Sequence, residues 1–311
     1  MVVASADLSN SDKTDGFLKY TKPFFRGDFN GAFLQVGVSE LTMAAICNGM
    51  ALHGGVIAAC GTFFVFSDFM KPAVRLAALM GLQVKYIWTH DAFRVGEDGP
   101  THQPVEQEAQ LRLMEHLKNH HGKMSLLALR PADAYETSVA WKIALENKET
   151  PTALILSRQN IKNLPARQGS TRYNDALQSS KGAYIVLDCE GTPDIVMVAS
   201  GSEVSTLVAG AELLESRNHL KTRIVSAISE GLFRQQSDDY KQSVIPSELP
   251  IFGLTAGLPV TLAGLVGNKG KIFGLDHFGY SAPAKVLDEK FGFTADNVYN
   301  QVIEYFNINK K

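Results

Sequence analysis

The feature that most constrains the fold of this 311-residue chain is a regular alternation between short apolar runs and segments with helical spacing. Four apolar runs in the first half lie at 56–60, 84–88, 126–129 and 153–156. Helical patterns between them cover 71–80, 105–117 and 134–147. Parallel strands need crossover connections of this kind, because a helix must return the chain to the same edge of the sheet. We therefore expect an α/β fold: a doubly wound, mainly parallel sheet flanked by helices.

The same alternation returns in the second half of the chain. Apolar runs lie at 183–187, 195–199, 223–226, 251–254 and 272–275, and the clearest helical patterns are 204–214 and 282–290. Between the two sets, residues 163–180 are polar and lack periodicity, as interdomain linkers often do. We predict a first domain at 1–165, a linker at 166–182 and a second, smaller α/β domain at 183–311.

Composition and charge exclude several classes of function. The net charge is −2 and no long basic run occurs, so we expect neither nucleic acid nor a membrane as a partner. No apolar stretch reaches the ~18 residues of a membrane-spanning helix, and the first four residues lack the charged start of a signal peptide. Cys47, Cys60 and Cys189 are scattered in apolar contexts, which indicates reduced core thiols in a cytoplasmic protein.

Glu40 is the first candidate functional residue. A helical pattern begins at Ser39, which can serve as the N-cap, and ends at Gly54-Gly55. Glu40 lies in the first turn of this otherwise small and apolar helix. It either complements the helix dipole or is a buried acid that donates a proton or hydrogen bond to a heteroaromatic nitrogen.

The densest group of ionisable side chains follows the apolar run at 84–88. Residues 89–104 contain His90, His102 and three acids among glycines and prolines. Loops that follow parallel strands share one edge of the sheet, so we expect His90, His102 and Arg158 to converge there. Histidines with an arginine favour an anionic or polyhydroxylated substrate. The alternative is that each histidine only satisfies backbone groups in a turn.

Two further patterns leave alternatives open. Phe63, Phe66 and Phe69 are three residues apart and form either ordinary core packing or a slot that stacks a planar ring. His116 and His120 have i, i+4 spacing but no evident third ligand, so we predict no metal site in the chain. No GxGxxG or GxxxxGK[ST] loop occurs around residues 96–99.

Several short motifs keep a fixed order along the chain. They are Ser5-Ala6-Asp7-Leu8, Gly37-Val38-Ser39-Glu40, residues 48–55 and 62–66, Thr89-His90-Asp91, residues 130–133, 154–160, 199–203 and 278–283, and the highly specific run Gly96-Glu97-Asp98-Gly99-Pro100-Thr101-His102-Gln103-Pro104. Together they resemble transketolase, a thiamine-diphosphate enzyme. The likeness spans nearly the whole chain but covers only two of the family's three domains, the pyrimidine-binding and C-terminal domains. The domain that holds the diphosphate and a divalent metal is not covered.

The resemblance implies roles for individual residues. Glu40 and His102 would be catalytic, with Glu40 facing the N1′ atom of the cofactor's aminopyrimidine. Cofactor-binding residues would be Glu40, Phe63, Phe66, Phe69 and Asp7. Substrate hydroxyls would meet Asp98 and His102, and the phosphate end would meet His90, Arg158 and Ser11. A phosphate-binding arginine of the family lies upstream of Met1.

The function expected from the resemblance is half of a transketolase, which moves a two-carbon ketol unit between sugar phosphates with thiamine diphosphate. Ligands for Mg²⁺ or Ca²⁺ are expected on an N-terminal half, without which the chain would be inactive. We expect a homodimer, or a heterotetramer with that half. The motifs disfavour deoxyxylulose-phosphate synthase and dehydrogenase β-subunits, whereas dihydroxyacetone synthase remains an alternative. A non-catalytic assembly or regulatory module is a second alternative, disfavoured by the intact set of Glu40, His90, His102 and Arg158.

Overall fold

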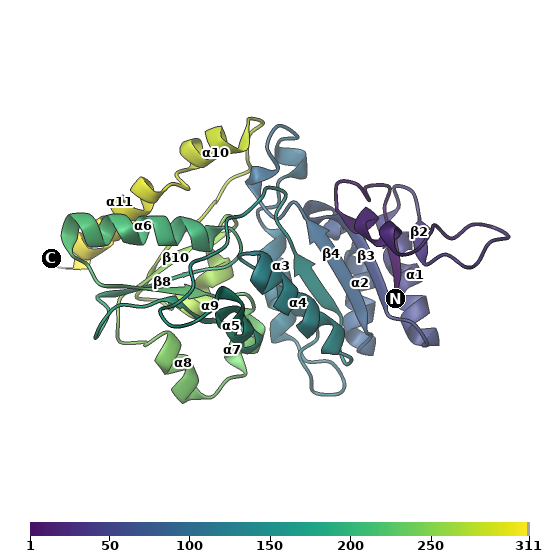
Figure 1. The fold of residues 1–311 in the computed structure, drawn as a ribbon, viewed down its shortest axis with the longest axis horizontal. Coiled ribbons are helices and arrows are strands. Elements are labelled where there is room, and N and C mark those ends of the chain that lie inside the picture. Colours follow the sequence, from purple (N-terminus) through teal and green to yellow (C-terminus); the bar gives the residue numbers. More distant parts are fainter. Residues whose placement is uncertain (310–311) are drawn as a thin grey trace.

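The computed structural model describes residues 1–309, which form two sheets side by side (Figure 1). The first sheet has six parallel strands in the order β2-β1-β3-β4-β6-β5. The strands are β1 (Val2–Ser5), β2 (Phe33–Gln35), β3 (Ala58–Phe63), β4 (Val84–Thr89), β5 (Leu127–Leu129) and β6 (Thr152–Ile155). The predicted doubly wound, parallel sheet is therefore confirmed.

Helices bury both faces of this sheet. They are α1 (Glu40–His53), α2 (Ser67–Met80), α3 (Gln107–His116) and α4 (Ala134–Glu146), with 3-10 helices at Thr14–Lys19, Phe64–Phe66, Phe93–Val95 and Pro100–His102. Residues of α1, α2 and α3 pack with Tyr86 and Trp88 on one face. Residues of α4 pack with Leu129 and Leu154 on the other. Strands buried on both sides explain the near-continuous apolar runs in the sequence.

Helix α1 starts and stops where the sequence predicts, although its cap differs. Ser39 occupies the N-cap position, but its Oγ donates to the carbonyl of Val36 at 3.1 Å instead of accepting from the helix. Gly54 ends the helix with a φ of 81°. That left-handed backbone is one that glycine adopts readily. Glu40 is thus the first residue of α1, and its position follows from the sequence.

The second sheet has five strands in the order β11-β10-β8-β9-β7, in which β7 alone runs antiparallel to its neighbour. Its strands are β7 (Tyr184–Leu187), β8 (Ile195–Ala199), β9 (Thr222–Ser226), β10 (Ile251–Leu254) and β11 (Lys271–Phe273). The helices are α6 (Glu203–Asn218), α7 (Glu230–Arg234), α8 (Asp238–Val244), α9 (Ala263–Val266), α10 (Ala284–Phe291) and α11 (Ala295–Asn309), with a 3-10 helix at Pro259–Leu262.

The polar segment between the sheets contains two short helical elements, α5 (Arg172–Ala176) and a 3-10 helix at Leu177–Lys181. Arg172 ties it to both halves: Nη2 donates to Glu136 at 3.1 Å and Nη1 to the Tyr184 hydroxyl at 2.7 Å. Lack of periodicity in the sequence therefore does not mean that the segment is loose, because buried ion pairs hold it in place.

One sequence inference about cysteines is wrong. Cys47 and Cys60 are buried thiols, as expected, but Cys189 is only partly buried in a loop after β7 and is not a core residue. Within residues 1–309, no helix is both long and apolar enough to cross a bilayer.

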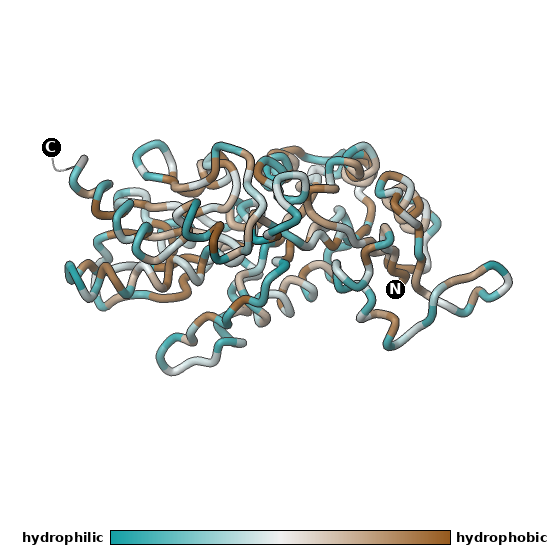
Figure 2. The backbone as a smooth tube through the Cα atoms, turned by 90° about the horizontal axis from the view of Figure 1, so that it is seen from above, coloured by the Kyte–Doolittle hydropathy of each residue, from teal (hydrophilic) through white to brown (hydrophobic). Residues whose placement is uncertain are grey.

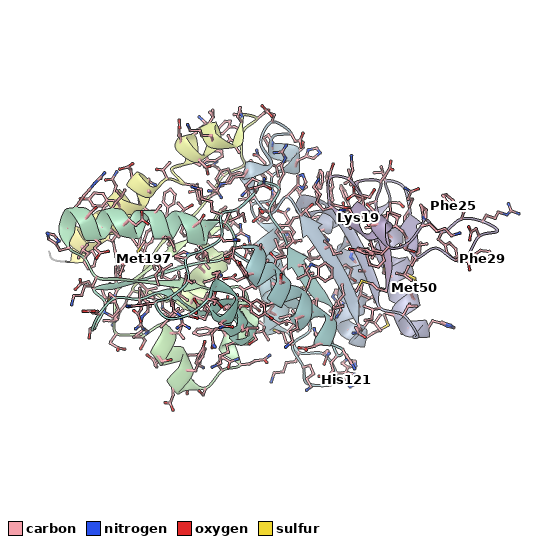
Figure 3. All side chains as sticks on the ribbon, in the orientation of Figure 1. Lys19, Phe25, Phe29, Met50, His121 and Met197 are labelled. Carbon is pink, nitrogen blue, oxygen red and sulfur yellow. The ribbon has the colours of Figure 1, made fainter. Side chains whose placement is uncertain are left out.

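The loop at 20–32 projects from the β2 edge of the molecule (Figures 2 and 3). Phe25 and Phe29 lie on this projection, and both side chains are exposed, as is that of Tyr20. Lys22 forms an ion pair with Asp28 across the loop. The aromatic side chains are therefore displayed outward and contribute little to the core.

The order of strands shows where the first sheet has the reversal of winding at which ligands usually bind. Strand β1 pairs with β2 on one side and with β3 on the other, so the chain reverses its direction of winding between β1 and β3. In open α/β sheets, ligands bind outside the carboxyl ends of the strands at such a point. The loops after β1, β3 and β4 all open there.

Candidate active site

The carboxyl ends of the strands of the first sheet bring the predicted residues to one edge. Asp7 and Ser11 follow β1, Phe63 ends β3, His90 follows β4 and Arg158 follows β6. The predicted convergence of the loops carrying His90 and His102 is borne out by the contacts that both imidazoles make with Phe63. Parallel pairing explains it, because every such strand ends on the same side.

His90 packs against Phe63 at this edge of the sheet. Its ring stacks on Phe63 with 3.6 Å between centroids, and its Nδ1 lies 2.9 Å from the hydroxyl of Thr89. Its backbone is left-handed, with a φ of 62°. Burial lowers the pKa of His90 to about 4, and the positive charge of Arg158 acts in the same direction. The ring is therefore neutral near pH 7, with one nitrogen free to donate or accept.

The phenylalanine triplet and His102 form a continuous aromatic wall. Phe63 and Phe66 stack at 5.9 Å, and Phe66 and Phe69 at 6.0 Å between centroids. His102 meets Phe66 edge to face at 5.3 Å. The stack runs from Phe63, which is buried at 7% exposure, to Phe69, which is 62% exposed, so only one end of the triplet is core packing. An open aromatic surface of this kind can stack a planar ring.

Glu40 is a buried carboxylate with few partners. Its exposed fraction is 7%, and its one hydrogen bond within residues 1–309 is a long one, from the hydroxyl of Thr62 at 3.4 Å. Glu136, buried more deeply, receives hydrogen bonds from three groups: the Ala132 amide, the Tyr184 hydroxyl and Arg172. Buried carboxylates usually have several donors. Glu40 is therefore poised for a further polar partner.

The loop after β1 is held by a buried acid that sequence reasoning missed. The carboxylate of Asp12 accepts from the hydroxyls of Ser5 at 2.9 Å and Thr14 at 2.6 Å, and burial raises its pKa. Gly61 allows this approach, since a Cβ there would lie 2.5 Å from Thr14 Cγ2. The spacing Ser5-x6-Asp12-x-Thr14 was the available signal. These contacts fix the turn that carries Asp7 and Ser11.

Lys13 is a second missed residue. It is exposed, has a left-handed backbone with a φ of 65°, and its charge helps to lower the pKa of His90. Arg158 and Asp98 are also exposed, and their charges act on His90 in opposite directions. Ser11 is half-buried, and its hydroxyl donates to Asn10 at 3.3 Å. This edge thus carries the cations Lys13 and Arg158 and the acid Asp98, whose charges all act on His90, together with the Ser11 hydroxyl.

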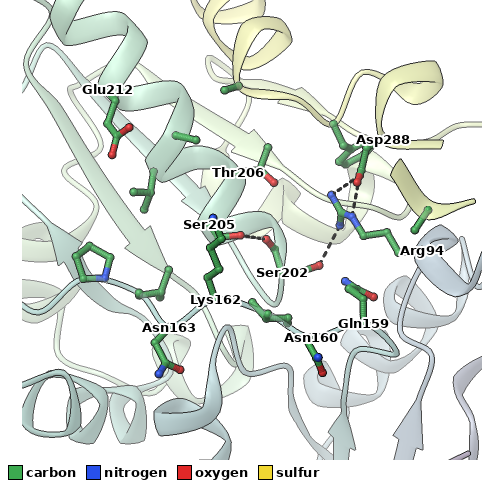
Figure 4. Close-up of a pocket in the computed structure, with 18 residues that line it drawn as sticks. Arg94, Gln159, Asn160, Lys162, Asn163, Ser202, Ser205, Thr206, Glu212 and Asp288 are labelled. Atoms are coloured by element: carbon green, nitrogen blue, oxygen red, sulfur yellow. Dashed lines mark hydrogen bonds and ion pairs between the residues drawn. The ribbon is translucent and has the colours of Figure 1, made fainter. Parts of the chain in front are cut away.

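His116, considered above as a possible metal ligand, does not lie at this edge. It lies against Arg234, with 2.6 Å between the ring Nε2 and the guanidinium. No cluster of metal-ligating side chains occurs in the described part of the chain. A cavity of about 600 Å³ lies instead between the two halves, lined by Arg94, Gln159 and Ser202 among others (Figure 4).

Comparison with protein families now identifies the chain. Residues 1–163 match the model described as "Transketolase, pyrimidine binding domain", and residues 182–294 match "Transketolase-like TK C-terminal domain". The chain belongs to the transketolase family. A curated transketolase from Halalkalibacterium halodurans is 46% identical over 296 residues, which is 94% of this chain and 42% of the relative. The chain thus spans less than half the length of that transketolase.

Solved transketolase structures share the fold. The transketolase from Leishmania mexicana superposes with a TM-score of 0.87 at 39% identity, covering 98% of this chain and 42% of that one. A structure titled "Split gene transketolase, inactive beta4 tetramer" has a TM-score of 0.73 at 23% identity, covering 98% of this chain and 92% of that one. The second likeness is at the level of the fold alone.

Proposed function

We propose that this chain is the pyrimidine-binding and C-terminal part of a transketolase. It would transfer a two-carbon ketol unit from a ketose phosphate to an aldose phosphate with thiamine diphosphate as cofactor. The observation that carries the proposal is the sparsely bonded carboxyl of Glu40, whose hydrogen bond comes from Thr62, the residue before Phe63 in the stack of Phe63, Phe66 and Phe69. We assign residues 1–165 and 183–311 to the two domains and 166–182 to the linker, in keeping with the matched ranges.

The residues of this chain fit the pyrimidine end of the cofactor. Glu40 would hold a proton against the N1′ atom of the ring, because its second oxygen and its weak bond to Thr62 leave it free to do so. The aromatic wall would stack the ring and exclude water from it. Asp7 would lie beside it at the end of β1. Thiamine diphosphate, when bound, supplies the centre that accepts and stabilises the two-carbon unit.

The substrate would lie along the loop after β4. Arg158, His90 and Ser11 would hold its phosphate, with Arg158 supplying the charge because His90 is neutral near pH 7. His102 and Asp98 would contact the hydroxyl groups, and His102 is held for this by the Thr101 hydroxyl, 2.9 Å from its Nδ1. His102 is also the group we assign to proton transfer at those hydroxyls.

The diphosphate and its Mg²⁺ or Ca²⁺ would be held by an N-terminal half. Two observations support a partner: the chain spans 42% of a curated relative, and a fold neighbour is titled a split-gene transketolase. Helix α1 is apolar yet exposed at Leu41, Ile46 and Leu52. We propose that this face pairs with a second copy in a homodimer, or in a heterotetramer with the other half.

Ketol transfer by the 311-residue chain tests the proposal, measured alone and after addition of a separately produced diphosphate-binding half with thiamine diphosphate and Mg²⁺. We expect no turnover alone and turnover with the added half. Turnover by the chain alone contradicts the need for a partner. No turnover with any diphosphate-binding half, while the cofactor is bound, favours a non-catalytic module.

A further inference from the structure

The second half of the chain contacts and holds the loop at 89–104, which carries the residues proposed to face the substrate. Arg94, within this loop, reaches into the second half: its Nε donates to Asp288 at 2.8 Å and its Nη1 to Ser202 at 3.0 Å (Figure 4). The same Nη1 also donates to Glu203 at 2.8 Å. Phe93 beside it packs edge to face on Phe291, with 5.1 Å between centroids. The loop is therefore anchored from outside its own domain.

A second anchor lies at the other end of the loop. The amide nitrogen of Gln103 donates to the carbonyls of Phe93, Gly96 and Tyr280, at 3.0, 3.1 and 3.0 Å. No side chain fits at Gly279, where a Cβ would lie 1.7 Å from Gln103 Oε1. Tyr280 belongs to the segment that leads into α10, so both ends of the loop rest on the second half (Figure 1).

Arg130 connects the second half to Asp91, the residue after His90. Its side chain is 1% exposed and donates twice to Asp91 Oδ2, at 2.7 and 3.1 Å. Its Nη1 also donates to Glu203, the first residue of α6, and to the carbonyl of Ser200 at 3.1 Å. A Cβ at Gly201 would lie 2.8 Å from the guanidinium. The chain of contacts runs from α6 through one arginine to the residue after His90.

The charges in this cluster are mutually dependent. Burial raises the pKa of Asp91, although Arg130 opposes that rise. Burial acts likewise on Glu203, but Arg130 and Arg94 prevail and hold its pKa below the usual value. A buried acid without its cation would neutralise or move. Loss of the Glu203 carboxylate therefore leaves Arg130 with only the neutral oxygens of Ser200 as partners in the second half.

We propose that Arg130 and Glu203 are positioning residues, through which the second domain holds His90 in its left-handed conformation against Phe63. A non-glycine residue with positive φ is intrinsically unfavourable and persists only where the surroundings impose it. Asp91 adjoins His90, and both its bonds are to Arg130. The second domain thus determines the geometry of this edge of the site. Only the assignment of this edge to substrate binding rests on the proposed function.

The test follows the imidazole of His90 by NMR in the full 311-residue chain, with the signal assigned from His90→Gln. Wild type should titrate near pH 4. Glu203→Gln should raise the His90 pKa by one unit or more, toward 6.5, because a released ring enters water. If the ring did not move, removing the negative charge of Glu203 would lower the pKa of His90. A rise in that pKa therefore shows that the imidazole has moved. Groups whose charges act on the ring are Arg158, Asp98, His102 and Lys13.

Arg172→Lys is the control, because Arg172 is another buried arginine that joins the two halves away from the loop. It should leave the titration of His90 unchanged. A folded Glu203→Gln chain whose His90 still titrates near pH 4 overturns the proposal. If Glu203→Gln does not fold, Asp91→Asn takes its place, with the same two outcomes.

Kinetics of the complemented enzyme give a second readout. Glu203→Gln should raise KM for the ketose phosphate about tenfold and change kcat less, because the lost contact affects the binding end of the site. Adding His90→Gln should then cost little more, since both act through one group. Additive effects of the two substitutions contradict the proposal. The NMR titration needs no turnover, so failure of ketol transfer and failure of this inference are separable.

Discussion

The imidazole of His90 lies against the phenyl ring of Phe63, with 3.6 Å between centroids and 22° between planes. The stack buries a titratable ring at the edge where the strands end, and burial is the largest cause of its low pKa. Near pH 7 the ring is therefore a neutral hydrogen-bonding group. Positive charge at this end comes from Arg158 and Lys13.

The stack makes stability depend on pH in a defined direction. His90 has a pKa of about 4 in the folded chain and about 6.5 when unfolded, so the unfolded chain binds more protons between these values. The contribution of the buried, neutral His90 to the free energy of unfolding is fully present above pH 6.5 and is lost as the pH falls toward 4. We expect a loss of about 1–2 kcal/mol of unfolding free energy, after allowance for solvent screening.

Urea unfolding of wild type and His90→Gln at pH 7 and pH 4.5 measures this contribution. Other buried acids titrate in the same range, so the difference between the two proteins is the informative quantity. An identical pH dependence in both would show that His90 is not the group responsible.

Glu40→Gln should leave the fold intact and lower ketol transfer by the complemented enzyme at least ~100-fold, since general acid–base catalysis contributes factors of that order. The amide keeps the shape of the side chain but carries no titratable proton. Glu97→Gln, an exposed acid in the neighbouring loop, is the control and should be nearly silent. Near-normal rates for Glu40→Gln contradict the assigned role.

Arg158→Gln should raise KM for a phosphorylated donor by about 10- to 100-fold, the cost of a charged hydrogen bond to phosphate. KM for an unphosphorylated ketose should hardly change, because the lost group meets only the phosphate. Arg217→Gln, at a half-exposed side chain near the end of α6, serves as the control for removing a positive charge. An equal rise in KM for both donors would show that Arg158 does not act on the phosphate.

Gly201→Ala should destabilise the chain by about 2 kcal/mol more than Gly169→Ala. Both glycines have positive φ, 59° and 75°, so both alanines carry backbone strain. Only at Gly201 would the Cβ meet the guanidinium of Arg130, 2.8 Å away, whereas Gly169 faces open space. Chemical denaturation measures the free energy of unfolding of both variants. Equal losses would show that the guanidinium of Arg130 moves away from the new Cβ without a cost in stability.

Leu52→Lys should weaken self-association by at least ~10-fold if the exposed face of α1 is a dimer interface. Leu52 is 60% exposed on that face. Leu113, 72% exposed on α3, provides the matched Leu113→Lys control. Light scattering across a concentration series gives the dissociation constants. No change for Leu52→Lys would place any interface on another surface.

Sequence patterns predicted most of the elements but not all of them. The strands β3 to β6 and the helix beginning at Glu40 follow from periodicity, because burial on one or both faces leaves a regular pattern. Helix α11 was missed, although Val298 and Val302 have helical spacing and Thr294 Oγ1 accepts from the Asn297 amide at its start. The antiparallel pairing of β7 could not be foreseen, since direction within a sheet leaves no mark on one strand.

By itself, the sequence determined which side chains stand at the ends of parallel strands. That is enough to bring His90, His102 and Phe63 to one edge, because parallel strands all end on the same side. The tertiary structure alone decided how these groups are held. Arg130 and Glu203 lie 73 residues apart, yet they share one buried ion pair. Its existence depends on how the two halves of the chain pack together, which no local pattern encodes.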